Sequence, residues 1–202
     1  MMNNNYSDAR DAAWKILLEC KVDKLPVKMS SICLKKSIRM ISYRRAASFL
    51  PDTLKECFEV TDGFTVNDAI FYDDENCTIE RQRFTIAHEI GHIILGHCRA
   101  KEYPESENNN IAEEKAANIF ASRLLAPSCV LWGCNVRTAD NVMELCDISR
   151  TAAEYRIDRM KQLYAREKEF RQRDNTSCFL RHPLERQVYK QFEEFINGHR
   201  YC

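Results

Sequence analysis

An HExxH pentapeptide, His88-Glu89-Ile90-Gly91-His92, lies inside a long apolar run and constrains this chain more than any other feature. On an α-helix, residues i and i+4 share one face, so the two imidazoles point toward the same place. Two neutral imidazoles at this spacing suit a zinc ion, and the glutamate between them stands where a general base is needed. The motif also occurs by chance on charged surface helices. Here apolar residues surround it, which predicts a buried helix, and a metal would offset the cost of burying the polar groups.

The third ligand has to come from outside the pentapeptide, because a catalytic zinc site has three protein ligands and one open position. His97 lies off the ligand face by helical angle, so we reject it as a ligand and expect it to end the helix. The next segment, residues 111–127, combines strong helix formers with a proline stop. Within it, Glu113 and Glu114 point about 100° apart, so only one of them can face the metal. Helical geometry alone does not choose between them.

Asn118 bears on this choice. It lies one turn after Glu114, where its amide could hydrogen-bond a metal ligand and fix the orientation of that ligand. For both glutamates the alternative is a solvated position in the first helical turn, which the helix dipole favours. This alternative is the account that we prefer for Glu113.

Two stretches of sequence resemble the ImmA/IrrE family of zinc metallopeptidase-like proteins. They are RFTIAHEIGHIILGH at residues 83–97 and the pattern E-x-x-x-N-x-F-A-x-x-L-L-x-P at residues 114–127. The resemblance implies that Glu114 is the third zinc ligand. It also implies that the substrate is a regulatory protein, often a helix-turn-helix repressor. Ala116 departs from the family pattern, since many members carry a second acidic residue there, but it is not one of the proposed ligands.

The sequence predicts a helix-rich α+β fold in which a small antiparallel sheet lies beside the HExxH helix. Glycine and proline are few, at five each, and helix formers abound. Asn67-Asp68 separates residues 64–66 from residues 69–72, which predicts a hairpin. The edge strand of such a sheet could hold a substrate peptide in extended form. Polar residues and a proline at 101–110 predict a mobile loop beside the cleft.

We expect three regions along the chain. They are a zinc metallopeptidase domain at residues 1–127, a helical region resembling a helix-turn-helix at 128–169, and a charged linker with a C-terminal helix at 170–202. We expect the linker at 170–175 and the helix at 184–196. Within 138–160, the second predicted helix carries three arginines but also two acidic residues. This mixture favours packing or a protein contact over DNA reading.

Composition excludes several classes of protein. Basic and acidic residues number 30 each, so no overall field attracts nucleic acid or an acidic membrane. No segment approaches the roughly 20 apolar residues that cross a bilayer. The N-terminus lacks the pattern of an export signal, and the ten cysteines are scattered without a CxxC pair. We therefore expect a cytoplasmic protein with reduced thiols.

These patterns together predict a zinc-dependent endopeptidase that holds one Zn²⁺ per chain. His88, His92 and Glu114 would bind the metal, and Glu89 would act as general base toward a protein substrate such as a repressor. A tyrosine or arginine from residues 69–83 could stabilise the oxyanion, and iron or manganese could occupy the same ligands as zinc. Two alternatives stay open. One is a non-catalytic regulatory protein that retains the fold, and the other is a DNA-binding regulator acting through residues 138–160.

Overall fold

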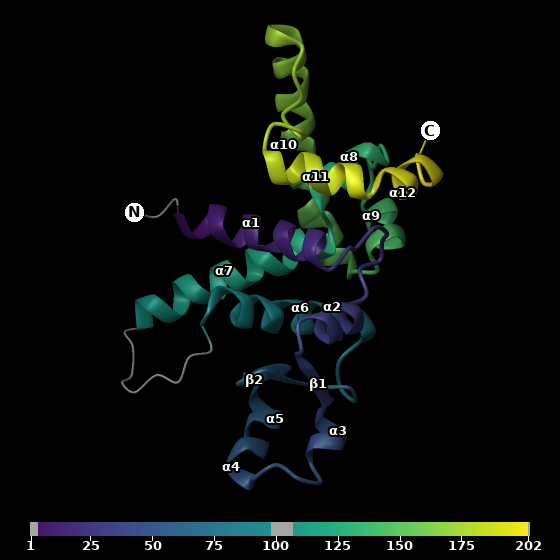
Figure 1. Ribbon diagram of the computed structural model, residues 1–202. Coiled ribbons are helices and arrows are strands. Elements are labelled where there is room, and N and C mark those ends of the chain that lie inside the picture. Colours follow the sequence, from purple (N-terminus) through teal and green to yellow (C-terminus); the bar gives the residue numbers. More distant parts are fainter. Residues whose placement is uncertain (1–3, 98–106, 202) are drawn as a thin grey trace. The chain divides into compact units, whose positions relative to one another are not determined.

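Helix α6 (Ile79–Leu95), which carries the HExxH motif, lies against one face of a small three-stranded sheet (Figure 1). The computed structural model describes residues 4–97 and 107–201. The remaining helices are α1 (Asn4–Glu19), α2 (Met29–Lys35), α3 (Tyr43–Ala46), α4 (Asp52–Lys55), α5 (Cys57–Val60), α7 (Glu107–Leu125), α8 (Ser128–Gly133), α9 (Ala139–Cys146), α10 (Arg150–Asp174), α11 (Pro183–Gln191) and α12 (Glu193–Gly198). The strands are β1 (Arg39–Ser42), β2 (Gly63–Val66) and β3 (Ala69–Tyr72). The helix-rich α+β class is confirmed.

The described residues form two compact units. The first comprises the residues up to Ala13 and those from Lys28 to Ser122, and the second comprises residues 14–27 and those from Arg123 onward. The sheet, α6 and most of α7 belong to the first unit. None of the helices in the described ranges has the length and apolar character needed to cross a membrane.

The sheet has the strand order β1-β3-β2, which leaves β2 at an edge. β2 and β3 pair antiparallel around Asn67-Asp68, as the sequence predicts, with Asn67 at a positive φ of 52°. β1 pairs parallel with β3, so the sheet is mixed rather than wholly antiparallel. The reason is the connection: residues 43–62 form α3, α4 and α5, which bring the chain back across the sheet between β1 and β2. The sequence patterns did not predict these three short helices.

Side chains alternate between the two faces of the sheet, and each face has its own cover. On one face, Tyr43, Phe58, Phe64 and Phe71 form an aromatic cluster, in which the rings of Tyr43 and Phe58 stack with centroids 4.1 Å apart. On the other face the sheet packs against α6. Gly63 faces Thr85 of α6, and a Cβ on Gly63 would collide with the Thr85 side chain. The absence of a side chain at Gly63 therefore lets the edge strand β2 pack closely against α6.

Helix α6 begins and ends with recognised capping features. The Thr78 side chain accepts a hydrogen bond from the main-chain N–H of Arg81 at the start. At the end, Gly96 takes a left-handed conformation with φ of 78°, and the N–H of His97 donates to the carbonyl of His92 at 2.9 Å. This turn folds His97 back toward the last turn of the helix.

Three sequence predictions differ from the structure. Of the predicted loop at 101–110, residues 101–106 lie outside the described residues, and residues 107–110 are the start of α7. The predicted linker at 170–175 is helical through residue 174, because α10 continues to that point and ends at Asn175 in a left-handed conformation. The predicted helix at 184–196 is interrupted at Phe192, which separates α11 from α12.

In the second unit, α9 and α10 form the helix pair that the sequence patterns at 138–160 predict. Asp147 ends α9 in a left-handed conformation, and the Ser149 hydroxyl caps α10 by accepting from the N–H of Ala152. Arg156 is buried and donates to the carbonyl of Ala126 and to the Ser128 hydroxyl. Arg156 therefore ties α10 to the turn that precedes α8.

Candidate metal centre

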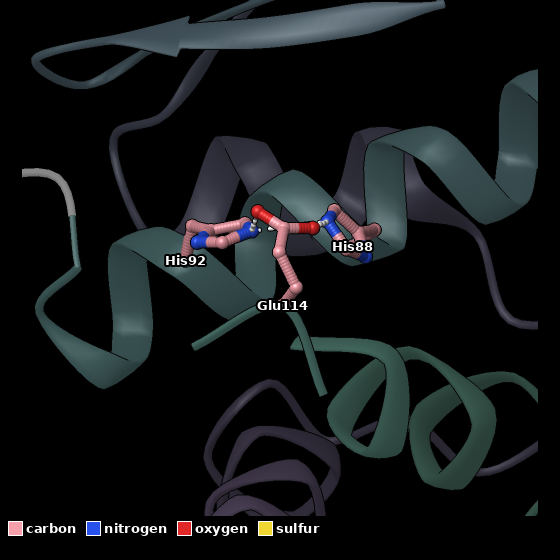
Figure 2. Close-up of side chains that lie close together, drawn as sticks. All are labelled: His88, His92 and Glu114. Atoms are coloured by element: carbon pink, nitrogen blue, oxygen red, sulfur yellow. Dashed lines mark hydrogen bonds and ion pairs between the residues drawn. The ribbon is translucent and has the colours of Figure 1, made fainter. Parts of the chain in front are cut away.

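His88 and His92 on α6 and Glu114 on α7 direct their side chains at one point (Figure 2). The two Nε2 atoms of the histidines are 3.0 Å apart. The Glu114 carboxylate lies 3.2 Å from Nε2 of His88 through Oε2 and 3.3 Å from Nε2 of His92 through Oε1. A four-coordinate ion with ligand bonds of about 2.0–2.1 Å keeps its ligand atoms about 3.3 Å apart. The donor atoms and their spacing therefore fit a metal ion.

Gly91 permits the approach of α7 that brings Glu114 to the histidines. A Cβ at this position would lie 3.0 Å from Cδ1 of Phe120 and 3.3 Å from Cα of Ala117, both on α7. These are tighter than ordinary carbon–carbon contacts of about 3.5–4.0 Å. Ala117 and Phe120 are fully buried. The absence of a side chain at Gly91 therefore sets the separation of the two helices at the site.

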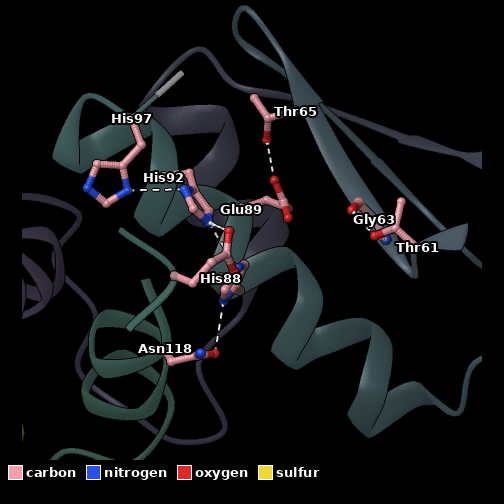
Figure 3. A network of polar contacts seen from close by, with 9 residues as sticks. Thr61, Gly63, Thr65, His88, Glu89, His92, His97 and Asn118 are labelled. Carbon is pink, nitrogen blue, oxygen red and sulfur yellow. Dashed lines mark hydrogen bonds and ion pairs between the residues drawn. The ribbon is translucent and has the colours of Figure 1, made fainter. Parts of the chain in front are cut away.

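Each histidine makes a second contact through Nδ1 (Figure 3). His88 Nδ1 lies 3.1 Å from Oδ1 of Asn118, and His92 Nδ1 lies 3.0 Å from Nδ1 of His97. A carbonyl oxygen only accepts, so this contact favours the His88 tautomer that is protonated on Nδ1 and leaves the lone pair of Nε2 for a metal. When Nδ1 of His92 donates to His97 in the same way, Nε2 of His92 carries a lone pair that can bind a metal. Such outer contacts orient metal-binding histidines.

Glu89 is buried on α6, with 8% of its surface exposed, and its Oε2 accepts a hydrogen bond of 2.7 Å from the Thr65 hydroxyl. Burial raises the pKa of the Glu89 carboxyl above its ordinary value, and the Glu114 carboxylate acts in the same direction. The Thr65 hydrogen bond and His88 oppose this rise in the pKa. A carboxylate with a raised pKa is suited to take and return a proton near neutral pH.

A cavity of about 590 Å³ opens over these side chains. Its wall includes residues 61–65 of the edge strand and the segment before it, Arg81 and Phe84 of α6, and Glu113 of α7. Arg81 forms an ion pair with Asp62 at the rim. A strand edge, a buried carboxylate and a group of metal-binding side chains therefore share one cleft, as a site for hydrolysis of an extended chain requires.

The predicted site residues occupy distinct positions in this arrangement. His88, His92 and Glu114 come together, and Glu89 lies beside them on the same helix. Glu113 also lines the cavity, but its carboxylate is not part of the His-His-Glu group. His97 is likewise outside that group and contacts His92 through Nδ1. Arg81 is the residue of the 69–83 segment that lines the cavity.

Thr65 is a polar residue of this site that the sequence patterns did not predict. It lies 24 residues before Glu89, in a strand whose pairing only the tertiary fold defines. One signal was present. A threonine placed among apolar residues in a hairpin next to a metal-binding helix faces either solvent or that helix.

Comparison with known proteins identifies the family. A search of curated protein sequences finds no match to this chain. The family model described as the IrrE N-terminal-like domain, a peptidase family, matches residues 51–158, which is more than half of the chain and includes the whole His-His-Glu group. The resemblance of residues 83–127 to ImmA/IrrE proteins is thereby confirmed, and the chain belongs to the IrrE N-terminal-like peptidase family.

Proposed function

We propose that this protein is a zinc-dependent endopeptidase in which His88, His92 and Glu114 bind the metal and Glu89 is the general base. The observation that carries the proposal is the spacing of the three donor groups, 3.0, 3.2 and 3.3 Å, which suits a tetrahedral ion. Two imidazoles and one carboxylate form a donor set typical of catalytic zinc. Membership of a peptidase family supports the same activity.

Each side chain of the cleft has a separate role in the proposed hydrolysis of a peptide bond. When bound, the zinc ion would polarise the scissile carbonyl and acidify a water molecule. Glu89 takes a proton from the attacking water and returns it to the leaving amine. Asn118 and His97 hold the imidazoles of His88 and His92 so that both Nε2 atoms keep their lone pairs. Burial of Glu89 keeps bulk water away from its carboxylate.

The substrate is a protein, and we propose a regulatory protein such as a helix-turn-helix repressor. Peptidase family membership supports a protein substrate in general, and the resemblance to ImmA/IrrE proteins supports a regulator. The free edge of β2 in the wall of the cleft suits an extended segment of such a substrate.

The contacts within α9 and α10 argue against DNA reading as the main activity. Arg150 is ion-paired with Asp140 at 2.7 Å, and Arg156 is buried against Ala126 and Ser128. Two of the three arginines available for phosphate or base contacts therefore bind groups of the protein itself. A structural role for this helix pair, or a contact with a protein partner, is favoured.

The proposal is tested by metal analysis and cleavage assays on the full chain. The purified protein is expected to contain one zinc ion per chain and to cut a repressor substrate, or peptides of a proteome-derived library, at defined sites. A chelator should stop the cutting, and added zinc should restore it. Absence of cleavage by the zinc-loaded protein would refute the proposal and favour a non-catalytic regulatory role.

A matched pair of variants separates metal binding from catalysis. Glu89→Gln is expected to keep one zinc ion per chain and to lose at least about 100-fold in kcat, because general base catalysis contributes about 10²–10⁴-fold. Glu59→Gln, an exposed residue of α5, makes the same chemical change away from the cleft and should cleave like the wild type. Equal activity of the two variants would exclude Glu89 as the base.

A further inference from the structure

The edge strand β2 offers few main-chain groups to a substrate. In an antiparallel pair, residues alternate between pairs that exchange hydrogen bonds and pairs that do not. The N–H of Asp73 donates to the carbonyl of Asp62 at 2.9 Å, which sets the alternation along the register. Phe64 and Val66 therefore bond to β3, and the main-chain groups of Gly63 and Thr65 point away from the sheet.

The outward groups of Gly63 already have an intramolecular partner. The Thr61 hydroxyl donates to the carbonyl of Gly63 at 2.7 Å and accepts from the N–H of Gly63 at 3.3 Å (Figure 3). One side chain thus covers both the donor and the acceptor at this point of the edge. Among the residues that the structure describes, Thr65 is then the β2 residue whose outward N–H and C=O remain for an extended peptide.

The side chain of the same threonine points the other way, toward α6. Its hydroxyl donates to Oε2 of Glu89 at 2.7 Å. Side chains of a strand stand roughly perpendicular to the sheet, whereas the main-chain groups lie within it. Thr65 can therefore contact a substrate and Glu89 at the same time, without any change in its own conformation.

We infer that Thr65 is a positioning residue that joins substrate binding to base orientation. Its main-chain N–H and C=O pair with one residue of an extended substrate. Its hydroxyl holds one oxygen of the Glu89 carboxylate and leaves the other oxygen to take the proton. This inference rests on the proposed peptidase function and extends it, because it assigns the residue at which the substrate main chain meets the base.

The side-chain role is tested by a pair of substitutions measured on a peptide that the wild type cleaves. Thr65→Val keeps the β-branched shape but removes the hydroxyl. It is expected to lower kcat about 10- to 100-fold, as the loss of an outer hydrogen-bond partner does, with KM and zinc affinity unchanged. Thr65→Ser should restore most of the loss in kcat. Thr53→Val, an exposed site on α4, is the control for the Thr-to-Val change.

The main-chain role is tested without turnover, by amide hydrogen exchange in the Glu89→Gln variant with and without the same peptide. The amides of Phe64 and Val66 should exchange slowly in both samples, because they bond to β3. The Thr65 amide should become slow only when the peptide is added. Equal Kd values for this peptide in Glu89→Gln and in the double variant with Thr65→Val are expected, because the hydroxyl faces the base.

The outcomes distinguish the two proposals. Full kcat in Thr65→Val, or a Thr65 amide that stays fast in the peptide complex, would overturn this inference alone. A Thr65→Ser variant as slow as Thr65→Val would also overturn it, since the effect would then come from packing. A zinc-loaded wild type that cleaves no peptide would overturn the proposed function and the inference together.

Discussion

Replacing Gly91 with alanine tests whether close contact between α6 and α7 sets the metal site. The new Cβ would meet Cδ1 of Phe120 at 3.0 Å and Cα of Ala117 at 3.3 Å. Ordinary contact needs about 3.5–4.0 Å, so the helices must separate by about 0.5 Å. Ala117 contributes main chain rather than a flexible side-chain end, so rotation of the Phe120 ring cannot relieve the whole clash.

The energetic effect of this substitution has two opposing parts. Overpacking of a filled core costs about 1–3 kcal/mol. Alanine in place of glycine within a helix returns about 1 kcal/mol through helix propensity. We therefore expect the metal-free protein to lose about 1 kcal/mol in free energy of unfolding.

The effect on metal binding should add to this loss. Metal–ligand distances tolerate about 0.2 Å of error, and a shift of about 0.5 Å in α7 exceeds that tolerance for Glu114. We expect the zinc affinity of Gly91→Ala to fall about tenfold, which corresponds to about 1.4 kcal/mol. The stabilisation by zinc, measured as the difference between denaturant unfolding with zinc and with chelator, should shrink by a similar amount.

Two controls sharpen the result. Gly198→Ala introduces the same atom where no heavy atom lies within 4 Å, and it should leave zinc affinity unchanged. Phe120→Leu combined with Gly91→Ala removes part of the clash, so the double variant should be more stable than the sum of the single effects predicts. If Gly91→Ala binds zinc as tightly as the wild type, the helix separation does not set the site and this reasoning is refuted.

Three further predictions follow from single contacts. Thr61→Val removes both hydrogen bonds that compete for the main-chain groups of Gly63, so KM for an extended peptide should fall about 3- to 10-fold in steady-state kinetics. An unchanged KM would show that the substrate does not use the edge at Gly63. Asn118→Leu removes the acceptor for Nδ1 of His88 and should weaken zinc binding about 10- to 100-fold in a chelator competition. Burial works to raise the pKa of the Asp73 carboxyl, but hydrogen bonds from the loop that follows it outweigh this and leave the pKa below its ordinary 3.8. The contribution of the Asp73 carboxylate to the free energy of unfolding is thus full above pH 3.8, and it is lost as the pH falls through the lower pKa of the folded state. Asp73→Asn should remove this acid dependence in denaturant titrations.

The sequence predicted the parts of the fold that local patterns determine. The apolar residues around the HExxH motif recur with a helical period, so the helix that became α6 was predictable. Asn67-Asp68 between two short apolar runs is a local hairpin signal, and β2 and β3 form there. The approach of Glu114 to the histidines is a long-range contact, which helical periodicity cannot predict. Glu114 was nevertheless chosen over Glu113, because the family resemblance indicates which glutamate is the ligand.

Parts that depend on tertiary contact were not predictable from these patterns. The parallel pairing of β1 with β3 depends on the path of residues 43–62, which carry weak periodicity. The contact of Thr65 with Glu89 depends on which face of the sheet α6 covers. His97 was judged by its angle on a continuing helix, but the chain leaves the helix at Gly96 and the angle no longer applies.

Two glycines of the motif region shape the site for different reasons. Gly91 lacks a side chain that would hold α7 away, so it acts through the space it leaves. Gly96 has open space around it but a φ of 78°, so it acts through a backbone conformation that other residues rarely adopt. The first brings Glu114 and Asn118 to the histidines, and the second returns His97 to His92. The contact of His88 with Asn118 therefore depends on the packing of α7, and the contact of His92 with His97 depends on the turn that ends α6, so the two ligands of one ion are oriented by separate features of the backbone.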